Sequence, residues 1–128
     1  MLVRVAAGII LRDGAVFIAL RKSSQHQGGL WEFPGGKCEL SEEPEVALLR
    51  ELEEECAIQV TENHYFKTVS HDYGDKVVEL LFYKVTGFTG EPIGKEGQEV
   101  RWVSVVDLPD YAFPEANVPI VDALISAL

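Results

Sequence analysis

The chain has 128 residues, 47% of them hydrophobic and 25% charged, and a formal net charge of −10. Its length suits one domain with a substantial core, and its composition is that of a folded rather than a disordered protein. The negative charge argues against a nucleic acid polymer as a partner, because phosphate backbones are bound by basic surfaces.

No segment predicts export or membrane insertion. The N-terminus lacks a charged region followed by an apolar run and a cleavage site, and no apolar run reaches membrane-spanning length. Cys38 and Cys56 lack a CxxC spacing. We expect both to be small buried hydrophobic residues, with a reactive thiol as the alternative at Cys38. We therefore expect a cytoplasmic protein without a membrane partner, as a monomer or weak dimer.

The N-terminal part predicts a hairpin followed by a loop. Leu2 to Leu11 is apolar and partly alternating, Asp13-Gly14 is a strong hairpin signal, and Ala15 to Leu20 returns as the partner strand. Gly8 predicts a bulge or a close backbone approach within the first strand. Residues 23–29 are polar and contain glycine, which predicts an exposed, mobile loop.

The middle of the chain predicts a turn and a helix. Trp31 to Phe33 is strand-like and leads into Gly35-Gly36, where the backbone can turn sharply. Pro44 suits the first turn of a helix that runs to about Cys56.

The C-terminal half predicts more strands and a closing helix. The expected ranges are a strand starting at 57–60, strands over 65–72, 76–85 and 100–106, a loop over 86–97, and an amphipathic helix over 118–128. The strand over 76–85 is almost wholly apolar, so we expect it to be central and buried. Two helices, the first of them between strands, predict one α/β domain over residues 1–128, with a mixed sheet covered on both faces.

Three glutamates stand at helical spacing near the end of the first helix. Glu51, Glu54 and Glu55 fall within an arc of about 100° on one face, where like charges repel. A hard cation among their oxygens relieves this repulsion, whereas the alternative is a solvated acidic face. Leu49 and Leu52 point away from this arc, so we expect both to anchor the helix on the sheet.

The surrounding stretch resembles the Nudix box of nucleoside diphosphate hydrolases. The matching positions are Gly36, Glu42, Arg50-Glu51-Leu52, Glu54-Glu55 and Ala57-Ile58. The one departure is Ala57, which stands where the family usually has glycine. A glycine there eases the helix exit at a positive φ or a close contact. The resemblance implies the Nudix fold, an α/β/α sandwich with a mixed β-sheet between helices.

The resemblance also implies a metal-dependent hydrolase and assigns roles. Glu54 and Glu55 match metal ligands, together with the Gly35 carbonyl, and Glu51 matches a carboxylate that binds metal or acts as general base. Arg50 matches the residue that orients the catalytic glutamate, and the alternative is an ordinary surface ion pair. These oxygen ligands suit Mg²⁺ or Mn²⁺, which would neutralise charge on a pyrophosphate and activate a water. We expect Arg50, Glu51 and Glu54 to be catalytic.

A second stretch resembles the MutT branch of this family. Residues 90–98, GEPIGKEGQ, imply that Glu96 lies at the metal site and assists catalysis. Arg21 matches a phosphate-contacting arginine, and Lys37 is a further candidate, with a surface lysine as the alternative. The similarity runs from about Val3 to Leu124. It implies sanitation of the nucleotide pool, in which 8-oxo-dGTP is cleaved to 8-oxo-dGMP and pyrophosphate and mutation is prevented.

Asn117 is the candidate for base recognition, because it matches the MutT-branch asparagine that reads the modified purine. A side-chain amide has a donor and an acceptor side by side. They pair with O6 and the N7 hydrogen of 8-oxoguanine, whereas N7 of guanine carries no hydrogen. The alternative is an N-cap of the last helix. Phe33, Phe82 and Phe113 are candidate base contacts or simply core.

Two other functions remain open. Residues 27–33, QGGLWEF, also resemble the pyrimidine branch of the family, which implies CTP or 5-methyl-dCTP as the rival substrate. The second alternative is a non-catalytic nucleotide sensor. Such proteins usually lose box carboxylates, whereas Glu51, Glu54 and Glu55 are all present here, so hydrolysis is favoured.

Overall fold

The computed structural model describes residues 1–22 and 28–128, so most of the predicted loop over 23–29 lies outside the described residues. The elements are β1 (Leu2–Arg12), β2 (Ala15–Leu20), β3 (Trp31–Glu32), β4 (Gly35–Lys37), α1 (Pro44–Cys56), β5 (Gln59–Asp72), β6 (Val77–Thr89), β7 (Val100–Ser104), the 3-10 segments η1 (Val105–Asp110) and η2 (Glu115–Asn117), and α2 (Val118–Ser126).

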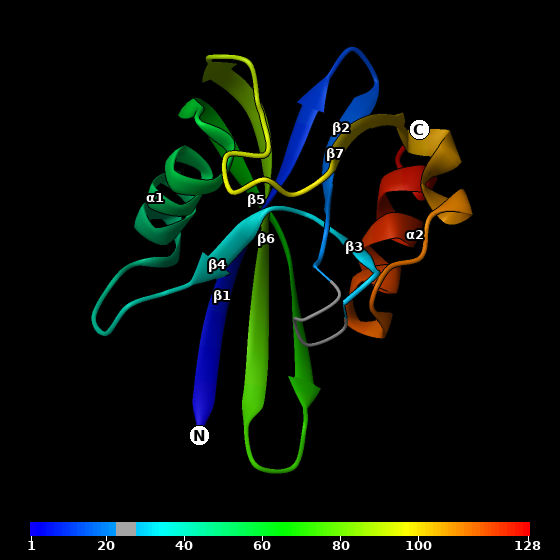
Figure 1. Cartoon of the computed structure of the whole chain (residues 1–128). Helices are drawn as coiled ribbons and strands as arrows, with labels where there is room; N and C mark the ends of the chain where they lie inside the picture. Colours follow the sequence, from blue (N-terminus) through cyan, green and yellow to red (C-terminus); the bar gives the residue numbers. More distant parts are fainter. Residues whose placement is uncertain (23–27) are drawn as a thin grey trace.

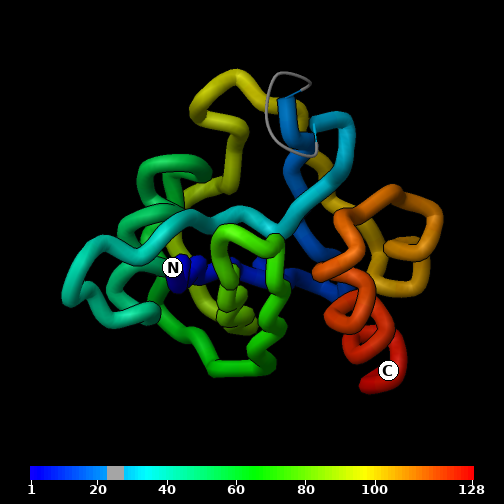
Figure 2. The backbone as a smooth tube through the Cα atoms, turned by 90° about the horizontal axis from the view of Figure 1, so that it is seen from below, coloured from blue at the N-terminus to red at the C-terminus, as the bar shows by residue number. Residues whose placement is uncertain are grey.

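A mixed sheet forms the middle layer of the molecule (Figure 1). Its strand order is β3-β2-β1-β6-β5, with β4 paired to β1 and β7 paired to β2. β1 and β6 are parallel, whereas the other pairs are antiparallel. The view along the strands in Figure 2 shows α1 on one side of the sheet and α2 on the other. This arrangement confirms the predicted α/β/α sandwich.

Alternation along β1 sends side chains into two cores. Ala6 and Ile10 belong to the core under α1, whereas Ala7 and Ile9 belong to the core under η1 and α2. Gly8 faces α1, and a Cβ there would lie 2.8 Å from Leu52 Cδ1. The predicted close approach at Gly8 is therefore confirmed, and the contact is with the helix that carries the glutamates.

One of the two predicted helix anchors is wrong. Leu52 is fully buried, but Leu49 is 38% exposed, and Leu48 is the buried partner instead. Leu48 and Leu52 are four residues apart and share one helix face, whereas Leu49 is rotated by about 100° from Leu48. No helix among the described residues is long and apolar enough to cross a membrane.

Several element boundaries also differ from prediction. The expected loop over 86–97 starts too early, because β6 continues to Thr89 opposite a single β5 that runs from Gln59. Gly87 pairs with Glu62 at a register shift of β5, and a Cβ on Gly87 would lie 3.0 Å from Glu62 Cβ. This glycine admits the bulge rather than ending the strand. The expected strand over 100–106 ends at Ser104, where η1 begins.

Candidate active site

Arg50 ties α1 to the loop that precedes it. Its Nε and Nη2 donate to the two carboxylate oxygens of Glu42 at 2.9 Å each, and Nη2 also donates to the Lys37 carbonyl at 3.1 Å. Its Nη1 donates to Glu51 at 2.9 Å and to Glu54 at 3.5 Å. Hydrogen bonds from Arg50 and the Glu39 amide lower the pKa of Glu42 to about 2. One guanidinium therefore links Glu42 of the loop to two of the three glutamates at positions 51, 54 and 55.

The glycine pair passes directly against the other side of these glutamates. Gly35 and Gly36 form most of β4, a strand rather than the expected free turn, and pair with β1. A Cβ on Gly36 would lie 2.3–2.6 Å from the carboxylate atoms of Glu51, and one on Gly35 would lie 2.0 Å from the Ala6 carbonyl oxygen. The Gly35 N–H donates to Glu55 Oε2 at 3.1 Å. Only glycine at both positions allows this approach.

Other carboxylates surround the partly buried side chain of Glu55. Burial raises its pKa to about 8, and the carboxylates of Glu51, Glu32 and Glu96 add to the rise against the Gly35 hydrogen bond. Burial likewise raises the pKa of Glu51 despite its hydrogen bond to Arg50. A divalent cation among these oxygens would relieve both effects. The residues present fit a hard cation such as Mg²⁺ or Mn²⁺, because they are oxygen donors.

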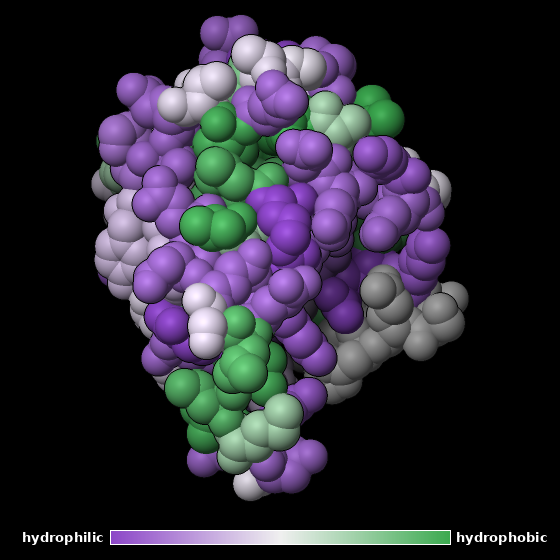
Figure 3. All heavy atoms as spheres, turned by 90° about the vertical axis from the view of Figure 1, so that its left-hand side faces the viewer, coloured by the Kyte–Doolittle hydropathy of each residue, from purple (hydrophilic) through white to green (hydrophobic). Residues whose placement is uncertain are grey.

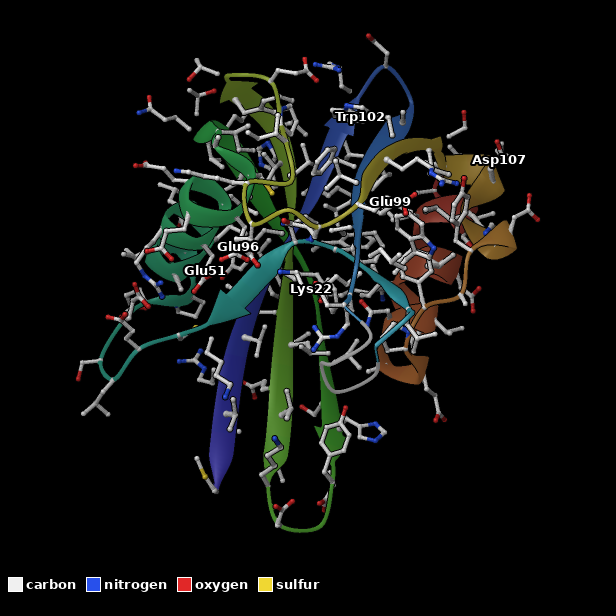
Figure 4. All side chains as sticks on the ribbon, in the orientation of Figure 1. Lys22, Glu51, Glu96, Glu99, Trp102 and Asp107 are labelled. Carbon is white, nitrogen blue, oxygen red and sulfur yellow. The ribbon has the colours of Figure 1, made fainter. Side chains whose placement is uncertain are left out.

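Two of these glutamates, Glu51 and Glu54, differ in exposure. The side chain of Glu51 is 16% exposed, whereas that of Glu54 is 59% exposed. Across residues 1–22 and 28–128, no group of three or more His, Cys, Asp or Glu side chains already has the arrangement of a metal-binding set. Glu96 comes from the segment before β7, and Figure 4 shows it beside Glu51, close to Lys22. The carboxylates thus gather at one place, and Arg50 holds two of them.

A cavity of about 370 Å³ adjoins the glycine pair. All five predicted substrate-binding residues line it, together with Gly35: Arg21, Phe33, Lys37, Phe82 and Asn117. Its volume lies in the range of small-molecule sites. Gly35, a predicted metal ligand, thus lines the same cavity as the five predicted substrate-binding residues, whereas the four predicted metal-binding glutamates are not among its lining residues.

Glu32, which was not predicted from the sequence, also lines this cavity. Its Oε1 accepts a hydrogen bond from Arg21 Nη1 at 2.6 Å, with 25% and 29% of the Arg21 and Glu32 side chains exposed. Burial raises the pKa of Glu32 even though Arg21 opposes the rise. The pairing of Ala19 with Glu32 between β2 and β3 brings the two side chains together. Because this pairing is tertiary, no local signal marked Glu32. Tyr73 and Lys76 of the β5–β6 turn were not chosen either, and both line the cavity.

Asn117 does not act as the predicted alternative, a helix cap. It occupies the N-cap position of α2 but makes no side-chain capping hydrogen bond. Phe33 is 4% exposed and Phe82 is 1% exposed, and their rings meet edge to face at 6.0 Å. Phe113 stacks on Phe33 at 5.2 Å. Phe33 and Phe82 are therefore core residues whose edges also form the cavity wall.

Both cysteines neighbour the site, since Cys56 follows Glu55 and Cys38 follows Lys37. Cys56 is buried and Cys38 is half-buried. Burial raises the pKa of both thiols, that of Cys56 to about 12. A raised pKa disfavours the thiolate and hence a reactive thiol at Cys38.

Comparison with known proteins gives concordant matches. The profile of the NUDIX domain matches residues 5–123. The 8-oxo-dGTP diphosphatase of Escherichia coli K12 is 39% identical over 94% of this chain and 95% of its own length. The CTP pyrophosphohydrolase of the same organism is 34% identical, covering 98% of this chain and 93% of its own length. A solved MutT structure, from work on the Aliivibrio salmonicida and Vibrio cholerae proteins, is 42% identical, with a TM-score of 0.91 over the whole of both chains.

Proposed function

Because the chain belongs to the Nudix family of hydrolases, we propose that it cleaves 8-oxo-dGTP to 8-oxo-dGMP and pyrophosphate. In this reaction the oxygen of water bonds to the β-phosphorus, and the bond from that phosphorus to the α–β bridging oxygen breaks. The bridging oxygen leaves with the α-phosphate, and the protons of the attacking water are taken up by carboxylate or solvent. The products are a nucleoside monophosphate and pyrophosphate.

One observation carries the proposal: a single cavity joins a candidate base reader to the carboxylate region. Asn117 lines it, as do Gly35 and Gly36, which contact Glu55 and lie against Glu51. Within the described residues, the Asn117 side chain makes no capping hydrogen bond to α2, so capping does not occupy the amide donor and acceptor that would read the base. A purine bound beside Asn117 would extend its phosphates toward the box glutamates.

The residues of this chain divide the work. Arg21 and Lys37 bind phosphate oxygens, and Asn117 orients the base. Arg50 holds Glu51 in place, and the oxygens of Glu51, Glu54, Glu55, Glu96 and Gly35 would hold the cation. When bound, a divalent ion, Mg²⁺ in our proposal with Mn²⁺ as the alternative, supplies charge neutralisation and an acidified water. Glu51 or another of these carboxylates takes the proton.

Several wider expectations belong to this proposal. We take residues 1–128 as one domain that works in the cytoplasm, as a monomer or weak dimer. Its partner is a small nucleoside triphosphate rather than a nucleic acid polymer or a membrane. The net charge of −10 supports this choice, since one bound triphosphate needs only a local cation bridge.

A pyrimidine nucleotide is the rival substrate, favoured by the 34% identity to the CTP pyrophosphohydrolase. The two proposals differ at Asn117. We expect Asn117→Ala to lose the preference for 8-oxo-dGTP over dGTP while hydrolysis of dGTP persists, because an unmatched buried hydrogen-bonding group costs about 1–3 kcal/mol, or about five- to 160-fold.

The test compares kcat/KM for 8-oxo-dGTP, dGTP, 5-methyl-dCTP and CTP, following pyrophosphate release. Asn63→Ala is the matched control, because Asn63 lies on β5 and contacts Glu45 instead of the cavity. Equal preference in the Asn117→Ala variant and the parent would refute the recognition role. A parent that prefers CTP would overturn the substrate.

A further inference from the structure

The segment that carries Glu96 is docked on the C-terminal end of α1. The last carbonyls of a helix lack partners within the helix. Here the Cys56 carbonyl accepts the Ile93 N–H and the Glu55 carbonyl accepts the Lys95 N–H, both at 3.0 Å. The residue next to Glu96 is thus bonded to the backbone of Glu55, so the two carboxylates belong to one connected unit.

Two side chains hold the peptide groups of Glu96 itself. The Glu96 N–H donates to Gln98 Oε1 at 2.9 Å, and the Glu96 carbonyl accepts Lys22 Nζ at 3.1 Å. The other end of the Gln98 amide, Nε2, donates to the Glu55 carbonyl at 3.5 Å. Gln98 therefore spans from the backbone of one proposed metal ligand to the backbone of the other.

We propose that Gln98 and Lys22 are positioning residues for Glu96. The inference rests on the proposed function, which places Glu96 at the metal site. Gly94 and Gly97 flank Lys95 and Glu96. The N–H of Gly97 donates a hydrogen bond to the Gly94 carbonyl and closes a tight turn. A glycine-flanked turn loses much conformational entropy when it is fixed, so side-chain restraints are needed to keep the Glu96 carboxylate facing Glu51 and Glu55.

The side-chain chemistry of Gln98 matches this task. Its amide offers an acceptor for the Glu96 N–H and a donor for the Glu55 carbonyl at the same time. Alanine offers neither, and glutamate offers only acceptors while adding a charge to a region already crowded with carboxylates. Lys22 lies two residues beyond β2, so it restrains Glu96 from outside the 90–98 segment.

The test uses the full chain and two readouts. The first is Mn²⁺ binding without nucleotide, and the second is hydrogen exchange of the Glu96 amide in metal-free protein. We expect Gln98→Ala and Lys22→Ala each to weaken Mn²⁺ binding by about fivefold, because each substitution removes a side-chain hydrogen bond to a peptide group of Glu96. We expect Gln98→Ala to speed exchange of the Glu96 amide as well. Gln59→Ala, an exposed glutamine on β5, is the matched control and should change neither.

A double-mutant comparison separates positioning from general stability. If Gln98 acts through Glu96, Gln98→Ala has no further effect on Mn²⁺ binding in a Glu96→Gln background. An undiminished effect there, or unchanged Mn²⁺ binding in both single variants, overturns the inference. If Gln98→Ala fails to fold, Lys22→Ala alone tests the positioning role. The conservative variant Lys22→Arg is then expected to bind Mn²⁺ as the parent does.

The same set of variants distinguishes this inference from the proposed function. Loss of pyrophosphate release in Glu96→Gln with no change in Gln98→Ala and Lys22→Ala leaves the proposed function standing and rejects the positioning role. A parent protein that binds Mn²⁺ but hydrolyses no nucleotide rejects the proposed function, whereas the Mn²⁺ and exchange readouts still decide the positioning role.

Discussion

At the scale of single residues, Ala57 is held in a conformation that its side chain disfavours. It is the C-cap of α1 and has φ 60° and ψ 33°, which is the left-handed region. The family's usual glycine predicts a positive φ or a close contact at this box position, and the structure confirms the positive φ. An L-residue there costs about 1–2 kcal/mol relative to glycine, and part of that is offset by the greater flexibility of glycine in the unfolded chain.

We therefore expect Ala57→Gly to raise the free energy of unfolding by about 1 kcal/mol, measured by urea denaturation. Ala127→Gly is the control, because Ala127 caps α2 at φ −87° and is also exposed. That substitution should bring no gain. An equal gain in both variants would mean that the left-handed geometry is not the cause.

Glu32 gives a second prediction at this scale. It orients the Arg21 guanidinium in the cavity through a hydrogen bond of 2.6 Å. Glu32→Gln replaces a charge-assisted hydrogen bond with a neutral one, so we expect KM for the nucleotide to rise about tenfold, with a smaller change in kcat. Glu99→Gln is the matched control, because Glu99 pairs with Arg101 at 2.7 Å on the exposed surface. A change confined to kcat would argue against a role in orienting Arg21.

At the scale of elements, α1 carries Glu51 and Glu54, and Arg50 of the same helix holds both through hydrogen bonds. We expect Arg50→Lys to lower kcat about 100-fold, because lysine cannot bond both oxygens of Glu42 and still reach Glu51. The matched control is Arg4→Lys, since Arg4 pairs with Glu79 at 3.2 Å on the sheet and contacts no box glutamate. Steady-state kinetics alongside thermal melting would check the prediction. A fall in melting temperature that alone accounts for the lost activity would contradict it.

How well each element could be predicted depends on how local its signal is. The helix from Pro44 to Cys56 was placed correctly, because its start signal and carboxylate spacing are local. The short strand at Gly35–Lys37 and the end of β6 were missed, because their pairing depends on distant segments. The same difference between local and long-range signals decides which site residues could be predicted. The box residues were found from their spacing, whereas Glu32 and Gln98 act through contacts that only the folded chain creates.

At the scale of the whole molecule, the expected oligomeric state depends on how much of the surface is apolar. Figure 3 shows a largely hydrophilic face on the α1 side, interrupted by separate hydrophobic patches. The exposed large hydrophobic residues include Val46 and Leu49 of α1, and Leu2 and Leu40. Light scattering at increasing protein concentration tests the expected monomer or weak dimer, and a stable dimer at low concentration would contradict it.

The charge of the site also sets how the stability of the whole fold depends on pH. The folded-state pKa of Glu55 is raised to about 8 from an ordinary value of 4.5. Between these values folded Glu55 keeps a proton that the unfolded chain has lost, so the free energy of unfolding of metal-free protein should fall as pH rises from about 4.5 to about 8. Glu55→Gln should flatten this fall, and the exposed Glu53→Gln should not.

Divalent metal should reverse this trend, because it binds the ionised carboxylate and not the protonated one. The stabilisation given by Mg²⁺ should therefore grow as pH approaches 8 and be small near pH 5, since protons and metal compete for Glu55. Melting temperatures measured with Mg²⁺ and with a chelator across this range provide the comparison. A stabilisation by Mg²⁺ that is independent of pH, or equal in Glu55→Gln, would mean that Glu55 is not a metal ligand. If these outcomes hold, the carboxylates that destabilise the metal-free fold are the same groups that bind the ion, because a bound cation would offset their mutual repulsion.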